Sequence, residues 1–116
     1  MSTDRLWLPK DITDRLVADF PNEDLLALQA VLGQYRGNEQ TRVIRCIVHC
    51  AERSVDKLLH YVGAAQTDYR NLIYWAEYTP ADERVQDFHY PFDQQPDFSD
   101  KESWVRRLWR RLTSQS

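Results

Sequence analysis

The densest group of residues that could do chemistry lies within the sequence TRVIRCIVHCAER, residues 41–53. Cys46, His49 and Cys50 stand at i, i+3 and i+4, a spacing that brings thiol and imidazole ligands together on a helix and suits zinc. On a helical wheel, however, both cysteines fall in the apolar arc, and His49 falls in a polar stripe beside arginines that would repel a cation. We therefore predict no metal site, no cofactor and two reduced, buried thiols.

The polar stripe of the same segment could instead bind an anion. It holds Arg42, Arg45, His49 and Arg53. Guanidinium groups bind carboxylates and phosphates through paired N–H donors, so a phosphorylated ligand is one hypothesis. The more frequent alternative is that these residues form salt bridges with acids of neighbouring helices or of the acidic segment 79–102.

Residues that could act in catalysis occur only singly along the chain. They are His49, His60, His89, Asp68, Glu77, Tyr69, Tyr74 and Tyr78. The sequence contains no Gly-rich phosphate loop, no His-Glu-x-x-His pattern and no Gly-x-Ser-x-Gly pattern. Acid–base or nucleophilic catalysis needs a placed pair of groups. We expect a protein that is not an enzyme.

The segment 99–116 gives the clearest sign of a binding surface. Ser99-Asp-Lys-Glu102 matches a capping box, and the residues after it predict a basic amphipathic helix with two Trp on its apolar face. Because Arg and Trp dominate the binding energy of many interfaces, we predict that this helix contacts a protein partner or a second copy of the chain. The predicted contact residues are Trp104, Arg107, Leu108, Trp109 and Arg111. The more frequent alternative is that this helix covers the chain's own core, with its arginines paired to the acidic segment 79–102; a less favoured one is that it lies on an anionic membrane.

Helices must position all these residues, and the spacing of apolar side chains predicts an all-α fold. We expect a compact domain of five helices, at about 11–20, 22–36, 38–53, 54–66 and 68–78, in an orthogonal or antiparallel bundle. The apolar arc of 41–53 covers roughly 200° of the wheel, twice that of a surface helix, so this helix should be central. In the last helix, Trp75 is expected on the buried side with Leu72 and Ala76.

The chain changes character at Thr79, where the helical periodicity stops. Residues 79–98 contain prolines, acids and aromatic rings, and disordered segments are poor in aromatics. We therefore predict an irregular arm whose rings dock on the core. The expected organisation is a helical core at 1–78, the arm at 79–98 and the terminal helix at 99–116, all within one structural domain.

Composition limits the functional class further. The chain has 116 residues, 42% of them hydrophobic, and a net charge of −3, which argues against nucleic-acid binding through bulk electrostatics. No apolar run approaches the ~20 residues that cross a bilayer, and no secretory signal is visible. We predict a small, soluble, cytoplasmic protein, of bacterial source, that acts as an adaptor or as an inhibitor of the immunity-protein kind, with self-association as one version.

Overall fold

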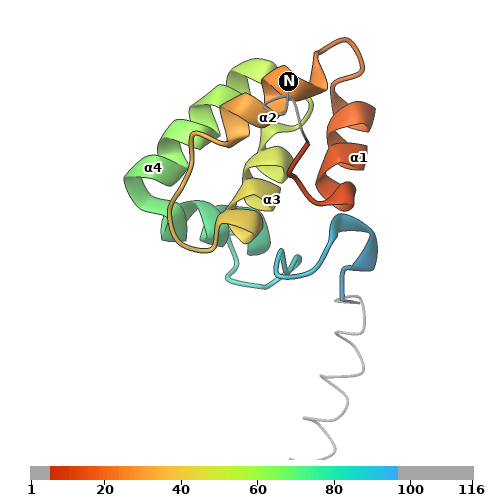
Figure 1. Cartoon of the computed structure of the whole chain (residues 1–116). Helices are drawn as coiled ribbons and strands as arrows, with labels where there is room; N and C mark the ends of the chain where they lie inside the picture. The colour runs from red at the N-terminus through yellow and green to blue at the C-terminus, as the bar shows by residue number, and fades with distance from the viewer. Residues whose placement is uncertain (1–5, 97–116) are drawn as a thin grey trace, which may run out of the picture.

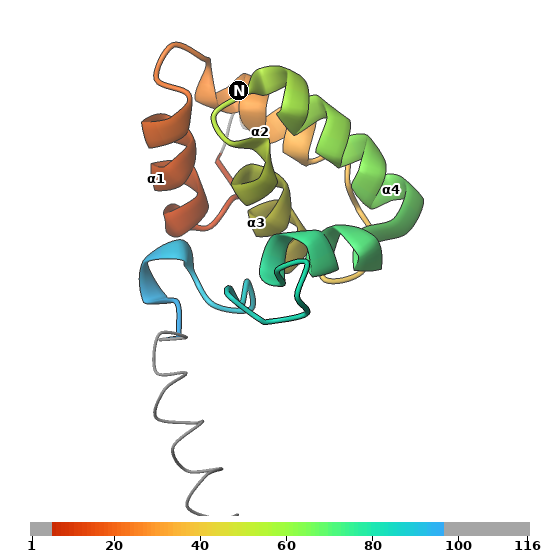
Figure 2. The same cartoon turned by 180° about the vertical axis from the view of Figure 1, so that it is seen from behind.

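The computed structural model describes residues 6–96 and shows an all-α fold (Figure 1). Within that range the α-helices are α1 Lys10–Asp19, α2 Leu25–Leu32, α3 Gln40–Ala51 and α4 Val55–Glu77, followed by a short 3-10 helix, η2 Phe92–Gln94. Helix α3 lies between α1 and α4 in both views of the molecule (Figure 2). None of the described helices is both long and apolar enough to cross a membrane.

Helix α3 is the most deeply buried element, which is why its apolar arc is so wide. Its fully covered apolar residues are Val43, Ile44, Cys46, Ile47, Val48 and Ala51. Leu16 of α1, Leu32 of α2 and Leu58 of α4 pack into the same core and are also fully buried. Neighbours therefore enclose α3 from several directions, as its sequence pattern requires.

The predicted count of five helices is not confirmed, because the segments expected at 54–66 and 68–78 run on as one helix, α4. The chain still bends where the break was expected, at Asp68, whose φ of −156° and ψ of 92° are not helical. The Asp68 carboxylate accepts hydrogen bonds from the backbone N–H of Arg70 (3.2 Å) and Asn71 (3.4 Å). Asp68 therefore caps the second half of α4.

Two other helix starts differ from the sequence prediction. Helix α1 begins at Lys10 with Pro9 at the N-cap position, which leaves the Asp11 side chain available for another partner. Helix α2 begins only at Leu25, where the Asp24 side chain accepts a hydrogen bond from the backbone N–H of Leu26 (3.1 Å). Pro9 suits the start of α1 because the backbone N–H groups at a helix start have no partner within the helix, so the N–H that proline lacks is not needed there.

The described part of the arm, residues 79–96, folds back beneath α4 and α3 and ends below α1 (Figures 1 and 2). Phe88 is fully buried in the helical core, and Phe92 packs against it with ring centroids 5.5 Å apart. The turn at the start of the arm is closed by a bridge between Tyr78 and Arg84. The predicted helix at 99–116 lies outside the described residues.

Candidate functional site

The four residues of the predicted anion-binding stripe do not lie together. Arg42 turns toward Glu77 at the end of α4: its Nε and NH2 atoms are 3.0 and 2.7 Å from the two carboxylate oxygens. It also reaches Glu39, at 3.0 Å. Arg42 is thus saturated by acids of its own chain, the arrangement that the salt-bridge alternative describes.

Arg45 also pairs with an acid of its own chain, here Asp11 of α1. Its side chain is only 8% exposed, and its Nε and NH2 atoms form a two-pronged pair with the Asp11 carboxylate at 2.9 and 3.1 Å. Its NH1 atom donates to the backbone carbonyl of Phe88 at 3.1 Å, and Asp11 also accepts from the backbone N–H of Phe92 at 3.1 Å. This pair therefore fastens the arm to both α1 and α3.

Glu77 is the second buried anchor of the arm. Its carboxylate accepts hydrogen bonds from Arg42, from Arg84 NH2 (2.9 Å) and from the backbone N–H of Phe88 (2.9 Å). Burial acts to raise the pKa of Glu77, but the hydrogen bonds from Arg42 and Phe88 outweigh it and hold the pKa below the ordinary value. Glu77 is therefore a structural anion, and its charge is fully compensated.

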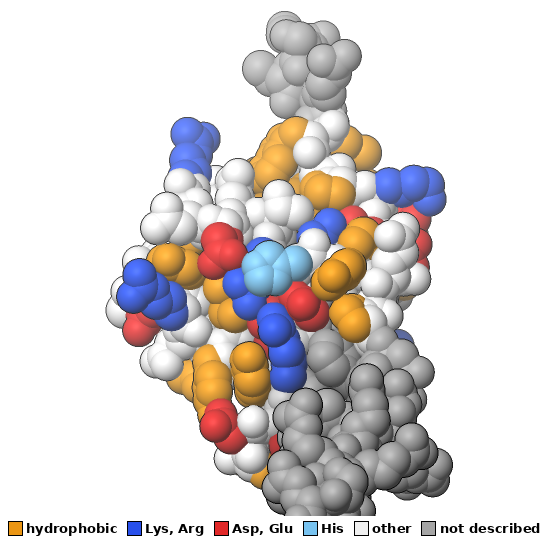
Figure 3. All heavy atoms as spheres, turned by 90° about the horizontal axis from the view of Figure 1, so that it is seen from below, with side chains coloured by type: hydrophobic (Ala, Val, Ile, Leu, Met, Phe, Trp, Pro, Cys, Tyr) orange, Lys and Arg blue, Asp and Glu red, His pale blue; other side chains and the backbone are white. Residues whose placement is uncertain are grey.

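His89 of the arm lies between two acids, Asp87 and Glu39. The molecule seen from below, in Figure 3, shows a histidine among side chains of both charges. Its Nδ1 lies 2.8 Å from Asp87 Oδ1, and its Nε2 lies 3.4 Å from Glu39 Oε1. The cluster links the arm to the start of α3. Because His89 and Glu39 are exposed, such contacts contribute little to stability.

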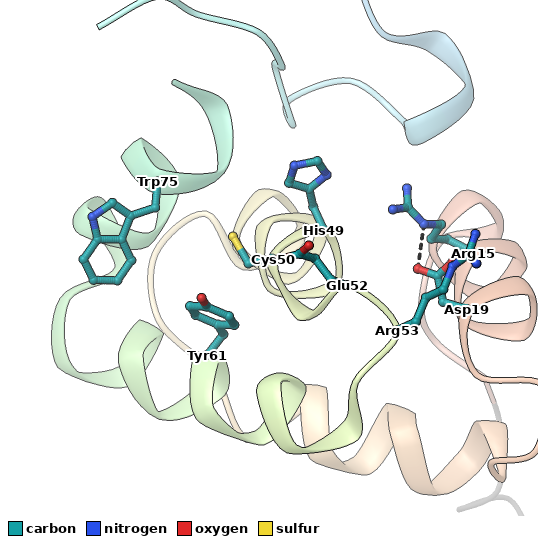
Figure 4. A pocket seen from close by; sticks show the side chains of 8 residues that line it. All are labelled: Arg15, Asp19, His49, Cys50, Glu52, Arg53, Tyr61 and Trp75. Atoms are coloured by element: carbon teal, nitrogen blue, oxygen red, sulfur yellow. Dashed lines mark hydrogen bonds and ion pairs between the residues drawn. The ribbon is translucent and has the colours of Figure 1, made fainter. Parts of the chain in front are cut away.

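The other two residues of the predicted stripe, His49 and Arg53, line a hollow of about 690 Å³ (Figure 4). We call it the Trp75 hollow. Its lining residues are Arg15, Asp19, His49, Cys50, Glu52, Arg53, Tyr61 and Trp75. Figure 4 shows the two aromatic residues on one side of α3 and the Arg15–Asp19 pair with Arg53 on the other.

The charged side of the hollow is organised by Asp19, whose side chain is almost buried. Its Oδ2 accepts a 2.8 Å hydrogen bond from Arg15 Nε, and its Oδ1 lies 3.8 Å from Arg53 Nε. The guanidinium of Arg15 also lies over the Phe92 ring, 4.8 Å from its centroid. Arg15 is thereby held in place by an acid and an aromatic ring, while Arg53 is largely exposed.

The backbone between α3 and α4 brings Arg53 to this position. Glu52 and Arg53 both have left-handed conformations, with φ of 49° and 65°. Such a conformation reverses the chain after a helix, and glycine usually provides it. Here two residues with side chains adopt it in succession, at a cost of the order of 1 kcal/mol each.

The aromatic side of the hollow is formed by Tyr61 and Trp75 of α4. Trp75 is 54% exposed, so the prediction that it lies on the buried side of its helix is wrong. Within residues 6–96, no hydrogen bond joins the Tyr61 hydroxyl, the Trp75 indole N–H or the His49 ring to another residue. These polar groups are therefore available to a ligand.

Burial favours the neutral forms of the His49 imidazole and of the Cys50 thiol, two of the groups that line the hollow. Burial, with a contribution from Arg15, lowers the pKa of His49 below its ordinary value. Burial raises the pKa of Cys50 to about 11, and that of the fully buried Cys46 above its ordinary value. The raised pKa values lower the fraction of each thiol that is present as the reactive thiolate. No group of three or more His, Cys, Asp or Glu side chains in the described part could hold a metal ion.

Sequence reasoning found two residues of the hollow, His49 and Arg53, and missed its other polar and aromatic members. The Arg15–Asp19 pair stands at i, i+4 and could have been found from local spacing, whereas the contact of Arg15 with the Phe92 ring joins segments far apart in the sequence. The predicted contact residues Trp104, Arg107, Leu108, Trp109 and Arg111 lie outside the described range. No protein-family model, curated protein or solved structure matches this chain.

Proposed function

We propose that this chain is a small non-enzymatic protein that binds a partner protein, as an adaptor or an inhibitor, and that the Trp75 hollow is one of its contact sites. The observation that supports this proposal most is the position of Trp75. More than half of this large apolar side chain is exposed, at 54%, and it faces a hollow with charged groups on the opposite side. Tryptophan and arginine, which both line this hollow, are among the residues that dominate binding energy at protein interfaces.

The size and make-up of the hollow support binding more than catalysis. Its volume of about 690 Å³ is within the range of ligand pockets. Its histidine is neutral and lacks an acidic partner among the described residues, and its thiol is protonated. The side chains that line it therefore offer hydrogen bonds, charge and aromatic area, which are the elements of recognition.

The C-terminal segment provides a second proposed contact surface. Its two Trp and four Arg, within residues 104–111, have the same hot-spot composition as the hollow. Self-association through Trp104, Leu108 and Trp109 is one form of this proposal. Separate substitutions in the hollow and in residues 104–111 test the two proposed surfaces.

The test is quantitative affinity capture from a lysate of the source organism, with the full-length chain and three variants. Trp75→Ala alters the hollow, Trp109→Ala alters the terminal segment, and Trp7→Ala is the matched control, because Trp7 lines a different hollow beside α2. Circular dichroism first establishes that each variant keeps the helical fold. We expect Trp75→Ala to lose a specific partner that Trp7→Ala retains.

The outcome separates the possible contact sites. Loss of the partner with Trp109→Ala alone would assign the contact site to the terminal segment. Loss with both Trp75→Ala and Trp109→Ala would assign it to a surface that includes both residues. Equal capture by all variants, together with a monomeric mass in light scattering at high concentration, would refute the proposal that this chain works by binding a protein.

A further inference from the structure

The charges around Asp19 indicate which chemistry the Trp75 hollow recognises. We propose that the hollow binds a segment of a partner protein in which a carboxylate side chain lies next to an aromatic one. This inference rests on the proposed protein-binding function and adds to it the chemical class of the ligand. The carboxylate binds between Arg15 and Arg53, and the ring packs against Trp75 and Tyr61.

Two guanidinium groups share one carboxylate at this site. Asp19 Oδ2 accepts a 2.8 Å hydrogen bond from Arg15 Nε, and Asp19 Oδ1 lies 3.8 Å from Arg53 Nε. Within the described part of the chain, neither arginine forms an ion pair with any other acid. Each guanidinium has five N–H donors in a fixed fork, and most of these donors have no acidic partner among residues 6–96. The local charge is positive, and a second carboxylate would compensate it.

The positions of the other charges favour the Arg15–Arg53 side for the carboxylate. Glu52, the remaining acid of the hollow, lies 3.6 Å from Lys57 and is therefore already paired. The C-terminal end of α3 separates the two sides in Figure 4 and carries partial negative charge from its last carbonyl groups. An anion is therefore excluded from the middle of the hollow and attracted to the arginines.

The opposite side of the hollow fits an aromatic ring. Trp75 is exposed, while Tyr61 is half-buried and its ring lies 5.0 Å from that of His60; both line the hollow, and their N–H and O–H groups have no hydrogen-bond partner within residues 6–96. Aromatic pairs gain about 1 kcal/mol beyond the area that they bury. A volume of about 690 Å³ exceeds the space that one side chain needs, so the hollow has room for two neighbouring side chains of a peptide.

The experiment uses three dipeptide probes that differ in one side chain: acetyl-Asp-Phe-amide, acetyl-Asn-Phe-amide and acetyl-Lys-Phe-amide. Binding to the full-length protein is followed by nuclear magnetic resonance, through the indole N–H signal that Trp75→Phe removes and so assigns. Because an ionic hydrogen bond is roughly twice as strong as a neutral one, we expect the Asp probe to bind about tenfold more tightly than the Asn probe.

Variants locate the carboxylate. Arg53 is 79% exposed, so Arg53→Gln changes charge without opening the core, and it should abolish the preference for Asp over Asn. Arg53→Lys should keep part of the preference, because it retains the charge and loses the fork. Arg36→Gln is the control, since Arg36 is an exposed arginine that lines the hollow beside α2; it should change nothing.

Several outcomes would overturn the proposed ligand. They are equal binding of the Asp and Asn probes, tighter binding of the Lys probe, shifts that do not include Trp75, and no shift with any probe at millimolar concentration. None of these outcomes changes the conclusion drawn from the affinity-capture experiment. If Trp75→Ala still loses its partner while the Asp probe shows no preference, the protein-binding function stands and only the ligand chemistry fails.

Discussion

The backbone N–H of Phe88 donates a 2.9 Å hydrogen bond to Oε2 of Glu77, the last residue of α4. The same carboxylate binds Arg42 of α3 and Arg84 of the arm, so one buried acid joins three segments. Phe88 in turn packs on His49 with ring centroids 5.1 Å apart. The anchor of the arm therefore also supports a residue of the Trp75 hollow.

Substitution of Glu77 should destabilise the fold strongly. Glu77→Gln keeps the shape of the side chain but leaves the partly buried Arg42 without its main counter-charge. Loss of one partner of a buried pair typically costs about 3–5 kcal/mol, so we expect a loss of about 3 kcal/mol in the free energy of unfolding, measured by urea titration with circular dichroism.

Asp14→Asn is the matched control for this measurement. Asp14 pairs with Lys10 at 2.7 Å, but both side chains are exposed, so the expected loss is under about 0.5 kcal/mol. Equal effects of the two substitutions would contradict the role of Glu77 as the anchor of the arm.

Stability should fall at acid pH because two anchoring acids have lowered pKa values. Burial opposes the lowering in both; for Asp11 the hydrogen bonds from Arg45 and Phe92 N–H outweigh it, as those from Arg42 and Phe88 N–H do for Glu77. Their unfolded values are near 3.8 and 4.5, so their contribution is complete above pH 4.5 and is lost as the pH falls through the folded values.

Urea titrations between pH 7 and pH 3 test this linkage. The wild-type free energy of unfolding should decrease below pH 4.5, and the decrease should be smaller in Glu77→Gln, which has one titrating anchor fewer. An identical acid profile in wild type and Glu77→Gln would show that other carboxylates control the acid sensitivity.

The central position of α3 could be predicted from the sequence, whereas the salt-bridge partner of its residue Arg45 could not. An apolar arc is a local pattern of one helix, so the central place of α3 and the all-α class could be predicted from residues 41–53 alone. The environment of Arg45 could not, because its partner Asp11 is 34 residues away and lies on another helix. Local spacing shows only neighbours at i±3 and i±4.

The exposure of Trp75 could not be predicted from the local pattern either. Its type and its place near Leu72 and Ala76 favour burial, and both of those neighbours are buried. Whether a residue at the edge of an apolar stripe is covered depends on which element packs there. Such packing depends on segments outside the stripe, so the spacing within the stripe does not determine it.

The thiols of the chain should react very slowly with alkylating agents. Burial raises the pKa of Cys50 to about 11, so at pH 7.5 its thiolate fraction is roughly a hundredfold below that of a free cysteine. Cys46 is fully buried and should react only when the protein unfolds. Iodoacetamide labelling followed by mass spectrometry of the intact chain measures both rates.

Two variants assign these rates. Cys46→Ser leaves only Cys50, and Cys50→Ser leaves only Cys46, each in the same fold. Both remaining thiols should label rapidly in urea. A native-state rate for Cys50 within tenfold of that of a free thiol would mean that the hollow lowers its pKa, and Cys50 would then be a candidate reactive group.

Glycine at position 52 should stabilise the protein. Glu52 ends α3 with φ 49° and ψ 50°, a conformation that costs a residue with a Cβ about 1 kcal/mol and costs glycine almost nothing. Glu52→Gly should therefore raise the free energy of unfolding by about 1 kcal/mol, less the greater backbone entropy that glycine gives the unfolded chain. Gln66→Gly, an exposed position inside α4, is the contrast and should lower it by at least about 1 kcal/mol, because it also removes the 3.0 Å hydrogen bond that Gln66 Nε2 donates to the Gln34 carbonyl. A loss of stability in Glu52→Gly would mean that the Glu52 side chain, which lies 3.6 Å from Lys57, contributes more than the backbone strain costs.

A gain of stability in Glu52→Gly, with the preference for the Asp probe unchanged, would show that the left-handed turn holds Arg53 beside Asp19 through its backbone path alone. The strain at Glu52 could then be removed without loss of recognition.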